Sequence, residues 1–168
     1  VRQWAKMLVD STPNHSTDAI ESPKDGFAAP IDDSVPFDLT DVQYAYWIGR
    51  NSSQQLGGVG THGYVEVESR SINIDRLQQS WLTLLRSHPM LRACYTEDGK
   101  QYVLPEPPHP TILVHDLTKM DESTREEALL STRERLSHRL LDIATGHVVS
   151  LEVSLLPQDV AVIHFDID

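Results

Sequence analysis

The chain has 168 residues, of which 39% are hydrophobic and 23% charged, as is typical of one globular domain with a real core. Its formal net charge of −11, without any basic run, argues against nucleic acid or an anionic membrane as a partner. The single cysteine, Cys94, excludes an internal disulfide and favours a reducing, cytoplasmic compartment. No apolar run has the length of a membrane span.

The first 35 residues differ in composition from the rest of the chain. Residues 1–10 (VRQWAKMLVD) have apolar side chains at helical spacing, whereas residues 11–35 are rich in Pro, Ser, Thr and Asp, as linkers are. We therefore expect a helix of a preceding unit, a linker, and a domain over residues 36–168. Because the chain begins at Val1 and ends at Asp168 within an apparent strand, we expect a piece of a larger protein.

The first half of this domain predicts two helices around a strand. Thr40 is a plausible N-cap for a helix over about 41–49, and the alternation in residues 62–72 predicts a half-buried strand. Asn73 is expected to cap a second helix that ends before Pro89. The core stripe expected on this helix consists of Ile74, Leu77, Trp81, Leu84 and Leu85.

The second half predicts mostly strands. Short strands are expected around 91–95, 100–104 and 111–115, followed by a helix that a Ser123–Glu126 capping box begins and that runs to about Leu141. A hairpin across PQD (157–159) follows. Its strands alternate, with apolar faces formed by Val149, Leu151, Val153, Leu155, Ala161, Ile163, Phe165 and Ile167. The layout is α+β, with helices set against a mixed sheet.

Two patterns could carry chemistry but have simpler interpretations. Gly58, Gly60 and Gly63 formally match a dinucleotide fingerprint, yet a helix and loop precede them and a strand follows, so we interpret them as a flexible turn. Cys94 is interpreted as a small buried hydrophobe, because no base can be placed beside it.

A polar stripe runs along the last hairpin. His164, Asp166 and Asp168 alternate and share one face, beside Ser150, Glu152 and Ser154 of the neighbouring strand. The pattern favours a solvated sheet face. A carboxylate-lined cleft or a divalent metal site are the alternatives, and metal is the weaker of the two because nothing orients a ligand set. We therefore predict no metal site.

Two segments resemble core motifs of the heterocyclization domains of nonribosomal peptide synthetases. FDLTDVQYAYWIGR (37–50) resembles the first motif, F-P-L-T-x-x-Q-x-A-Y-x-x-G-R, and SHPMLRA (87–93) the second, R-H-x-M-L-R. The matching residues are Phe37, Leu39, Thr40, Gln43, Ala45, Tyr46, Gly49, Arg50, His88, Met90, Leu91 and Arg92. Asp38 and Ser87 depart from the usual proline and arginine. LGGVGTHGYVEVE (56–68) is also similar to siderophore-type members, as in yersiniabactin and pyochelin synthetases. We expect the first motif to be an amphipathic helix with buried aromatics.

The resemblance implies the first, N-terminal lobe of a chloramphenicol-acetyltransferase-like fold, without the second lobe. Asp168 would be the first aspartate of the cyclization motif D-x-x-x-x-D-x-x-S, where condensation domains carry H-H-x-x-x-D-G. Its role is either catalytic or structural, and we expect a structural salt bridge. An anion that is partly buried needs a cationic partner, for which Arg92, Arg50 and Arg86 are the options.

The resemblance also implies an activity and partners. The parent enzyme would join an acyl or aryl thioester on an upstream carrier protein to Cys, Ser or Thr on a downstream carrier, and then close a thiazoline or oxazoline ring. The carriers bear 4'-phosphopantetheine, this lobe binds no cofactor, and an adenylation domain belongs to the same synthetase. Residues 1–10 are compatible with the last helix of a carrier protein. A plain condensation or acyltransferase domain and a non-catalytic docking lobe are the alternatives.

Overall fold

The computed structural model describes residues 32, 34–50 and 60–168, and Asp32–Asp168 form one compact unit. The helix predicted for residues 1–10 and most of the linker predicted for residues 11–35 lie outside the described residues, as does Gly58 of the glycine pattern. Among the helices that the structure describes, none is long and apolar enough to cross a membrane.

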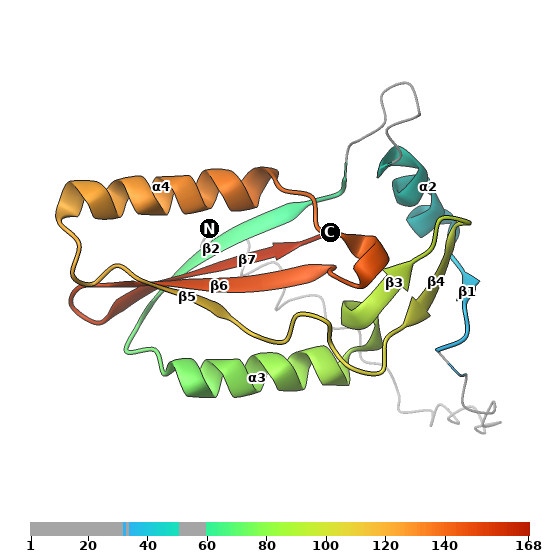
Figure 1. Ribbon diagram of the computed structural model, residues 1–168, viewed down its shortest axis with the longest axis horizontal. Helices are drawn as coiled ribbons and strands as arrows, with labels where there is room; N and C mark the ends of the chain where they lie inside the picture. Colours follow the sequence, from blue (N-terminus) through green and yellow to red (C-terminus); the bar gives the residue numbers. More distant parts are fainter. Residues whose placement is uncertain (1–31, 33, 51–59) are drawn as a thin grey trace, which may run out of the picture. The chain divides into compact units, whose positions relative to one another are not determined.

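A four-stranded mixed sheet forms the centre of the unit. Its order is β2 (Gly63–Arg70), β7 (Val160–Ile167), β6 (Val149–Leu156) and β5 (Leu113–Asp116). β5 runs parallel to β6, and the other neighbours are antiparallel. Helices α3 (Ile74–Ser87) and α4 (Glu122–His138) lie on opposite sides of this sheet (Figure 1). The predicted α+β architecture with a mixed sheet is thus confirmed.

A smaller sheet adjoins the first helix of the unit. It joins β1 (Phe37–Asp38), β4 (Lys100–Val103) and β3 (Ala93–Tyr95), and Phe37 pairs with Gln101. Helix α2 (Asp41–Arg50) follows β1 directly, and the 3-10 turns η1 (Pro89–Arg92) and η2 (Ile143–Thr145) connect to the two sheets. Figure 1 shows α2 beside β3 and β4.

The apolar core lies between α3 and the main sheet. Trp81 and Leu85 are buried there, and the Trp81 ring meets Phe165 edge-on at a centroid distance of 6.3 Å. Both predicted apolar faces of the last hairpin are confirmed. Val149 pairs with Ile167, and each of the other apolar residues predicted on β6 likewise pairs with one predicted on β7. The prediction for Leu84 was wrong: its side chain is 41% exposed, because it points to the outer side of α3.

The helix starts follow local hydrogen bonding. Asn73 accepts from the backbone N–H of Arg76, as predicted. The Ser123–Glu126 capping box was wrong, because Asp121 is the N-cap of α4 and accepts from the N–H of Thr124 at 3.0 Å. α4 also ends at His138 rather than near Leu141, since Arg139 takes an extended backbone conformation.

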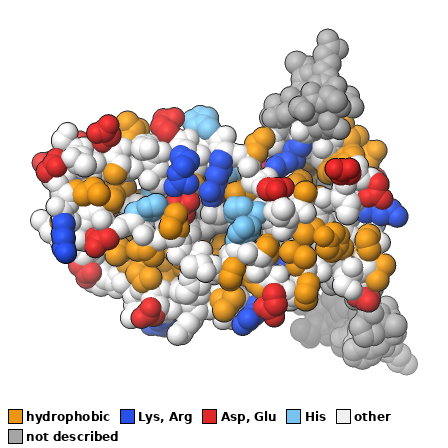
Figure 2. All heavy atoms as spheres, viewed as in Figure 1, with side chains coloured by type: hydrophobic (Ala, Val, Ile, Leu, Met, Phe, Trp, Pro, Cys, Tyr) orange, Lys and Arg blue, Asp and Glu red, His pale blue; other side chains and the backbone are white. Residues whose placement is uncertain are grey.

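The aromatic side chains of α2 are not buried, contrary to the expectation from sequence. Tyr44 is 48% and Tyr46 54% exposed, and none of the described residues of α2 is fully buried. The Tyr44 ring stacks on Trp47 at 5.7 Å. The reason is that α2 packs against a small sheet rather than into the main core. Figure 2 shows apolar side chains in orange in this region.

The polar stripe of the hairpin is covered, not solvated, so its interpretation as a solvated sheet face was wrong. His164, Asp166 and Ser154 are each 0% exposed and Glu152 is 4% exposed. The cause is α4, which lies over this face: Arg135 on the helix pairs with Glu152, and Arg139 just after the helix pairs with Asp166.

Candidate functional site at Asp168

The candidate site forms where β7 and α2 end. The backbone N–H of Asp168 donates to the carbonyl of Val148 at 3.0 Å, which holds Asp168 at the end of the sheet. Thr40 and Gln43 start α2 with a reciprocal cap, in which Thr40 N–H donates to Gln43 Oε1 and Gln43 N–H to Thr40 Oγ1. Ten residues later, α2 presents Arg50 at its last position.

Asp168 and Arg50 form a closed hydrogen-bonded ring with the backbone of Leu141. Arg50 Nη1 donates to Asp168 Oδ1 at 2.6 Å, and the N–H of Leu141 donates to Oδ2 at 2.6 Å. Arg50 Nη2 donates to the Leu141 carbonyl, also at 2.6 Å. The Asp168 side chain is 0% and that of Arg50 17% exposed. The expected cationic partner is therefore Arg50.

The other two candidate arginines have different contacts. Arg92 Nη1 donates to the carbonyl of Leu104 at 3.2 Å, and Arg86 pairs with Glu106 on the surface. His88 is exposed at the C-cap of α3, where its N–H donates to the Leu84 carbonyl. The second motif thus lies around η1 and does not line the cavity beside Asp168.

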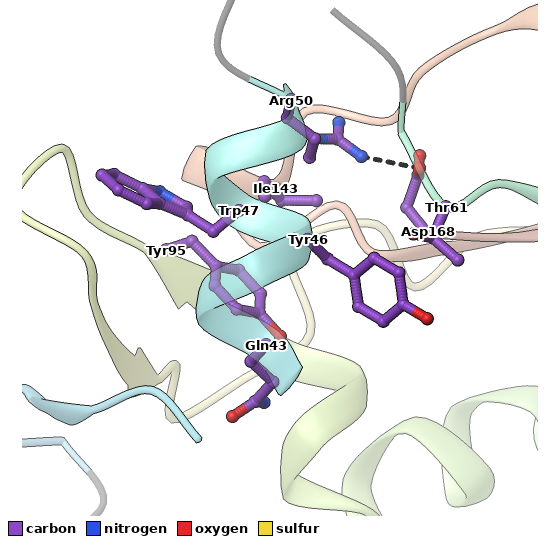
Figure 3. Close-up of a pocket in the computed structure, with 8 residues that line it drawn as sticks. All are labelled: Gln43, Tyr46, Trp47, Arg50, Thr61, Tyr95, Ile143 and Asp168. Atoms are coloured by element: carbon purple, nitrogen blue, oxygen red, sulfur yellow. Dashed lines mark hydrogen bonds and ion pairs between the residues drawn. The ribbon is translucent and has the colours of Figure 1, made fainter. Parts of the chain in front are cut away.

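A cavity of about 200 Å³ opens beside the Arg50–Asp168 pair. Its walls include three aromatic side chains and come from α2, β3, the segment before β2, η2 and the residue after β7. The lining residues are Gln43, Tyr46, Trp47, Arg50, Thr61, Tyr95, Ile143 and Asp168. Figure 3 shows Arg50 reaching from the end of α2 toward Asp168. A second hollow of about 430 Å³ shares Trp47, Arg50, Tyr95 and Ile143 with it, so the two form one groove.

Gln43 and Tyr95 supply fixed polar groups to this groove. Gln43 exchanges side-chain amide hydrogen bonds with Gln101, which is 3% exposed, at 3.0 and 3.1 Å. Burial raises the pKa of Tyr95, whose hydroxyl is hydrogen-bonded to Gln43. Tyr95 therefore remains a neutral phenol, which suits binding and orientation rather than proton transfer.

Of the residues singled out in the sequence, Gln43, Tyr46, Arg50 and Asp168 line this cavity together, a grouping that the sequence had not indicated. Thr61 lies in the siderophore-like stretch 56–68 without having been singled out, Tyr95 and Ile143 lie outside the quoted segments, and all three reach the groove through the tertiary fold. Gly60 is a further missed residue. A Cβ added there would lie 2.9 Å from Arg50 Nη1 and 3.0 Å from Asp168 Oδ1, so only glycine leaves room for the ion pair.

The covered polar face beneath α4 holds three carboxylates, each with its own arginine. Asp166 pairs with Arg139 at 2.6 Å, Glu152 with Arg135 at 2.6 Å and Glu66 with Arg133 at 2.7 Å. Burial alone would raise the pKa of Glu152, but hydrogen bonds from Arg135 and His115 lower it below the usual value. We interpret these pairs as structural, because each carboxylate is already engaged by an arginine and two of the three, Glu152 and Asp166, are buried.

Ser154 and His164 lie within hydrogen-bonding distance, like the first two members of a hydrolase triad. The Ser154 Oγ and His164 Nε2 atoms are 2.9 Å apart, and Tyr64 Oη is 2.8 Å from Nδ1. Burial lowers the pKa of His164. Since Ser154 and His164 are 0% exposed, no substrate reaches the hydroxyl. Among the described residues no group of three or more His, Cys, Asp or Glu side chains is placed to hold a metal ion.

Comparisons with known proteins agree with this geometry. No family model matches the chain. Phenyloxazoline synthase MbtB of Mycolicibacterium paratuberculosis is 35% identical over 170 residues, which are 100% of this chain and 14% of that protein. Pyochelin synthetase PchE of Pseudomonas aeruginosa is 32% identical over 126 residues, or 75% of this chain and 9% of that protein.

Solved structures show the same similarity. The EpoB cyclization-docking bidomain of Sorangium cellulosum superposes with a TM-score of 0.78 at 29% identity, covering 99% of this chain and 31% of that chain. The condensation domain of the polyketide synthase MokA, at 18% identity and a TM-score of 0.58, shares the fold.

The unit around Asp168 therefore has the fold of condensation and cyclization domains. Within that class, the chain belongs to the cyclization-domain family of nonribosomal peptide synthetases, which confirms the resemblance of the two motifs. The chain spans about one seventh (14%) of the length of the mycobacterial synthetases that it matches.

Proposed function

We propose that the protein acts as the first lobe of a cyclization domain that forms thiazoline or oxazoline rings during siderophore synthesis. The observation that supports this most directly is the aromatic groove next to the buried Arg50–Asp168 pair, built from the first motif. The relatives named phenyloxazoline synthase and pyochelin synthetase support the same reaction class.

The reaction has two steps, both at carrier-bound substrates. The amine of Cys, Ser or Thr on the downstream carrier attacks the thioester carbonyl of the upstream acyl or aryl group, and the upstream carrier thiol leaves. The side-chain thiol or hydroxyl then attacks the new amide carbonyl, and loss of water closes the ring. The first step needs two carrier-bound reactants aligned, the second needs the side chain held against its own amide carbonyl, and both need a site with little water.

This lobe contributes alignment rather than proton transfer. Both oxygens of Asp168 already accept hydrogen bonds at 2.6 Å, one from Arg50 and one from the Leu141 N–H. A carboxylate that is fully buried and held in this way is a poor general base, because taking up a proton would break the pair. We infer that Asp168 is structural and fixes the end of α2, so that Tyr46 and Gln43 face the groove.

The partners follow from this role. Upstream and downstream carrier proteins would present substrates on 4'-phosphopantetheine, whose thiol supplies the thioester. An adenylation domain and a second lobe of the same synthetase would complete the enzyme. We propose residues 1–10 as the last helix of a carrier protein, 11–35 as a linker and 36–168 as the lobe itself.

The test is Asp168→Asn in a synthetase that carries this lobe, with Asp116→Asn as control. Asp116 also ends a strand but is exposed. Breaking a truly buried pair costs on the order of 3–5 kcal/mol. We expect a lower melting temperature and a parallel loss of linear amide and ring product by mass spectrometry, with little change in the control.

Other outcomes would overturn parts of the proposal. A stable Asp168→Asn protein that accumulates linear amide would make Asp168 catalytic. A wild-type synthetase that forms the amide but never the ring would be a plain condensation enzyme. A wild type that forms neither product from loaded carriers would leave only a docking lobe.

A further inference from the structure

His62 is a buried side chain that the mechanism above does not use. It lies just before β2, and its side chain is 9% exposed. Its Nε2 atom is 2.8 Å from the carbonyl oxygen of Leu136 on α4. Because a carbonyl oxygen only accepts hydrogen bonds, Nε2 must carry the hydrogen. A neutral His62 therefore has a lone pair on Nδ1.

The lone pair on Nδ1 of His62 faces another hydrogen-bond acceptor. Nδ1 lies 3.7 Å from Oδ2 of Asp168 and has no hydrogen-bond partner among the residues that the structure describes. Two acceptors facing each other at this distance gain nothing and repel weakly. A proton on Nδ1 would convert the contact into a charge-assisted hydrogen bond.

The arginines near His62 are already paired with carboxylates, so the interaction with a protonated Nδ1 falls to Asp168. On α2, Arg50 is engaged with Asp168 Oδ1. Arg135 on α4 pairs with Glu152, and Arg139, the residue directly after α4, pairs with Asp166. The Leu136 carbonyl fixes the imidazole, so protonation needs only a small approach of Nδ1 to Oδ2 and no change of rotamer.

We propose that His62 is a proton-dependent positioning residue for Asp168. When His62 is neutral, Asp168 is held by two partners, Arg50 and the Leu141 N–H. When His62 is protonated, a third donor from the segment before β2 joins them. The carboxylate and the attached end of α2 are then held more rigidly beside the groove. The link to catalysis rests on the proposed function, whereas the contact itself does not.

The first test observes the imidazole nitrogens of His62 in the whole chain by NMR, with His62→Gln identifying the signal. Spectra are compared at about pH 8 and about pH 5.5. We expect Nε2–H with a bare Nδ1 at the higher pH. At the lower pH we expect a slowly exchanging Nδ1–H. A hydrogen on Nδ1 at the higher pH, or rapid exchange at the lower pH, would overturn the proposal.

The second test measures coupling between His62 and Asp168 by urea unfolding of single and double variants. His62→Gln places an amide near the Nε2 position and keeps the Leu136 contact, and the partner change is Asp168→Asn. We expect the coupling, expressed as a ratio of unfolding equilibrium constants, to rise by about tenfold from pH 8 to pH 5.5, because a charged hydrogen bond appears. A pH-independent coupling would show a merely structural histidine. Should Asp168→Asn not fold, the NMR result decides alone.

A third measurement separates this inference from the proposed function. In a synthetase that carries the lobe, the ratio of wild-type to His62→Gln turnover should rise as the pH falls. If the NMR and coupling results hold but loaded carriers yield no amide or ring, the positioning role stands and the proposed function fails. If turnover occurs with a ratio independent of pH, the function stands and the link to catalysis fails.

Discussion

The buried ion pair between Arg139 and Asp166 gives the sharpest prediction of stability. Arg139 donates from Nε to Oδ2 at 2.6 Å and from Nη2 to Oδ1 at 2.8 Å, and Nη2 also donates to Ser150 Oγ. The Asp166 side chain is 0% and that of Arg139 23% exposed. Arg139→Met would keep most of the apolar stem but leave a carboxylate in the layer beneath α4 without its arginine.

The expected loss follows from burial. Removing one partner of a buried pair costs about 3–5 kcal/mol, a large part of the ~5–15 kcal/mol that stabilises a typical domain. Arg86→Met is the matched control, because Arg86 also donates from two nitrogens, to Glu106, but this pair is 56% and 67% exposed. Exposed pairs contribute about 0–1 kcal/mol.

The assay is urea unfolding of the whole chain, followed by circular dichroism and analysed by linear extrapolation. A double variant, Arg139→Met with Asp166→Asn, should recover part of the loss because it removes the stranded charge. If Arg139→Met cost no more than Arg86→Met, the polar layer would not be a desolvated environment, and its description as structural ion pairing would be refuted.

Three further predictions concern the protonation of His164, the space beside Gly60 and the binding of zinc. Burial lowers the pKa of His164, so the unfolded chain binds its proton more readily and stability should fall as the pH drops below about 6.5. His164→Gln should make the urea midpoint fall less between pH 7.5 and about 5.5, and an unchanged slope would contradict this. Gly60→Ala should cost about 1–3 kcal/mol in the same assay, since its Cβ would lie 2.9 Å from Arg50 Nη1 and 3.0 Å from Asp168 Oδ1, and the buried ion pair would have to shift. Gly63→Ala is the control, with its Cβ in ordinary contact at 3.5 Å from Ile167 Cγ2, and equal losses would refute the steric argument. Micromolar zinc should leave the melting temperature unchanged, and saturable stabilisation that His164→Ala abolishes would reveal a metal site.

The sequence by itself was enough for the features that depend on local periodicity. The alternation in the last hairpin predicted its two apolar faces, because side chains of a strand point alternately to opposite faces. Asn73 was recognised as a cap because its side chain bonds to the N–H of Arg76, only three residues away. The two motifs indicated the family, and the first motif indicated three side chains of the groove, Gln43, Tyr46 and Arg50.

Only the tertiary structure decided which faces are covered and which charges meet. A strand with alternating polar residues has the same sequence pattern whether water or a helix covers its polar face. The burial of His164 and Asp166 therefore could not be predicted from the sequence of the hairpin. The environment of Asp166 depends on Arg139, which directly follows α4 and lies 27 positions earlier in the chain. The same holds for Asp168, whose partner Arg50 lies 118 positions earlier in the chain. Sequence patterns report neighbours within an element, whereas such pairs arise only when separate elements pack together.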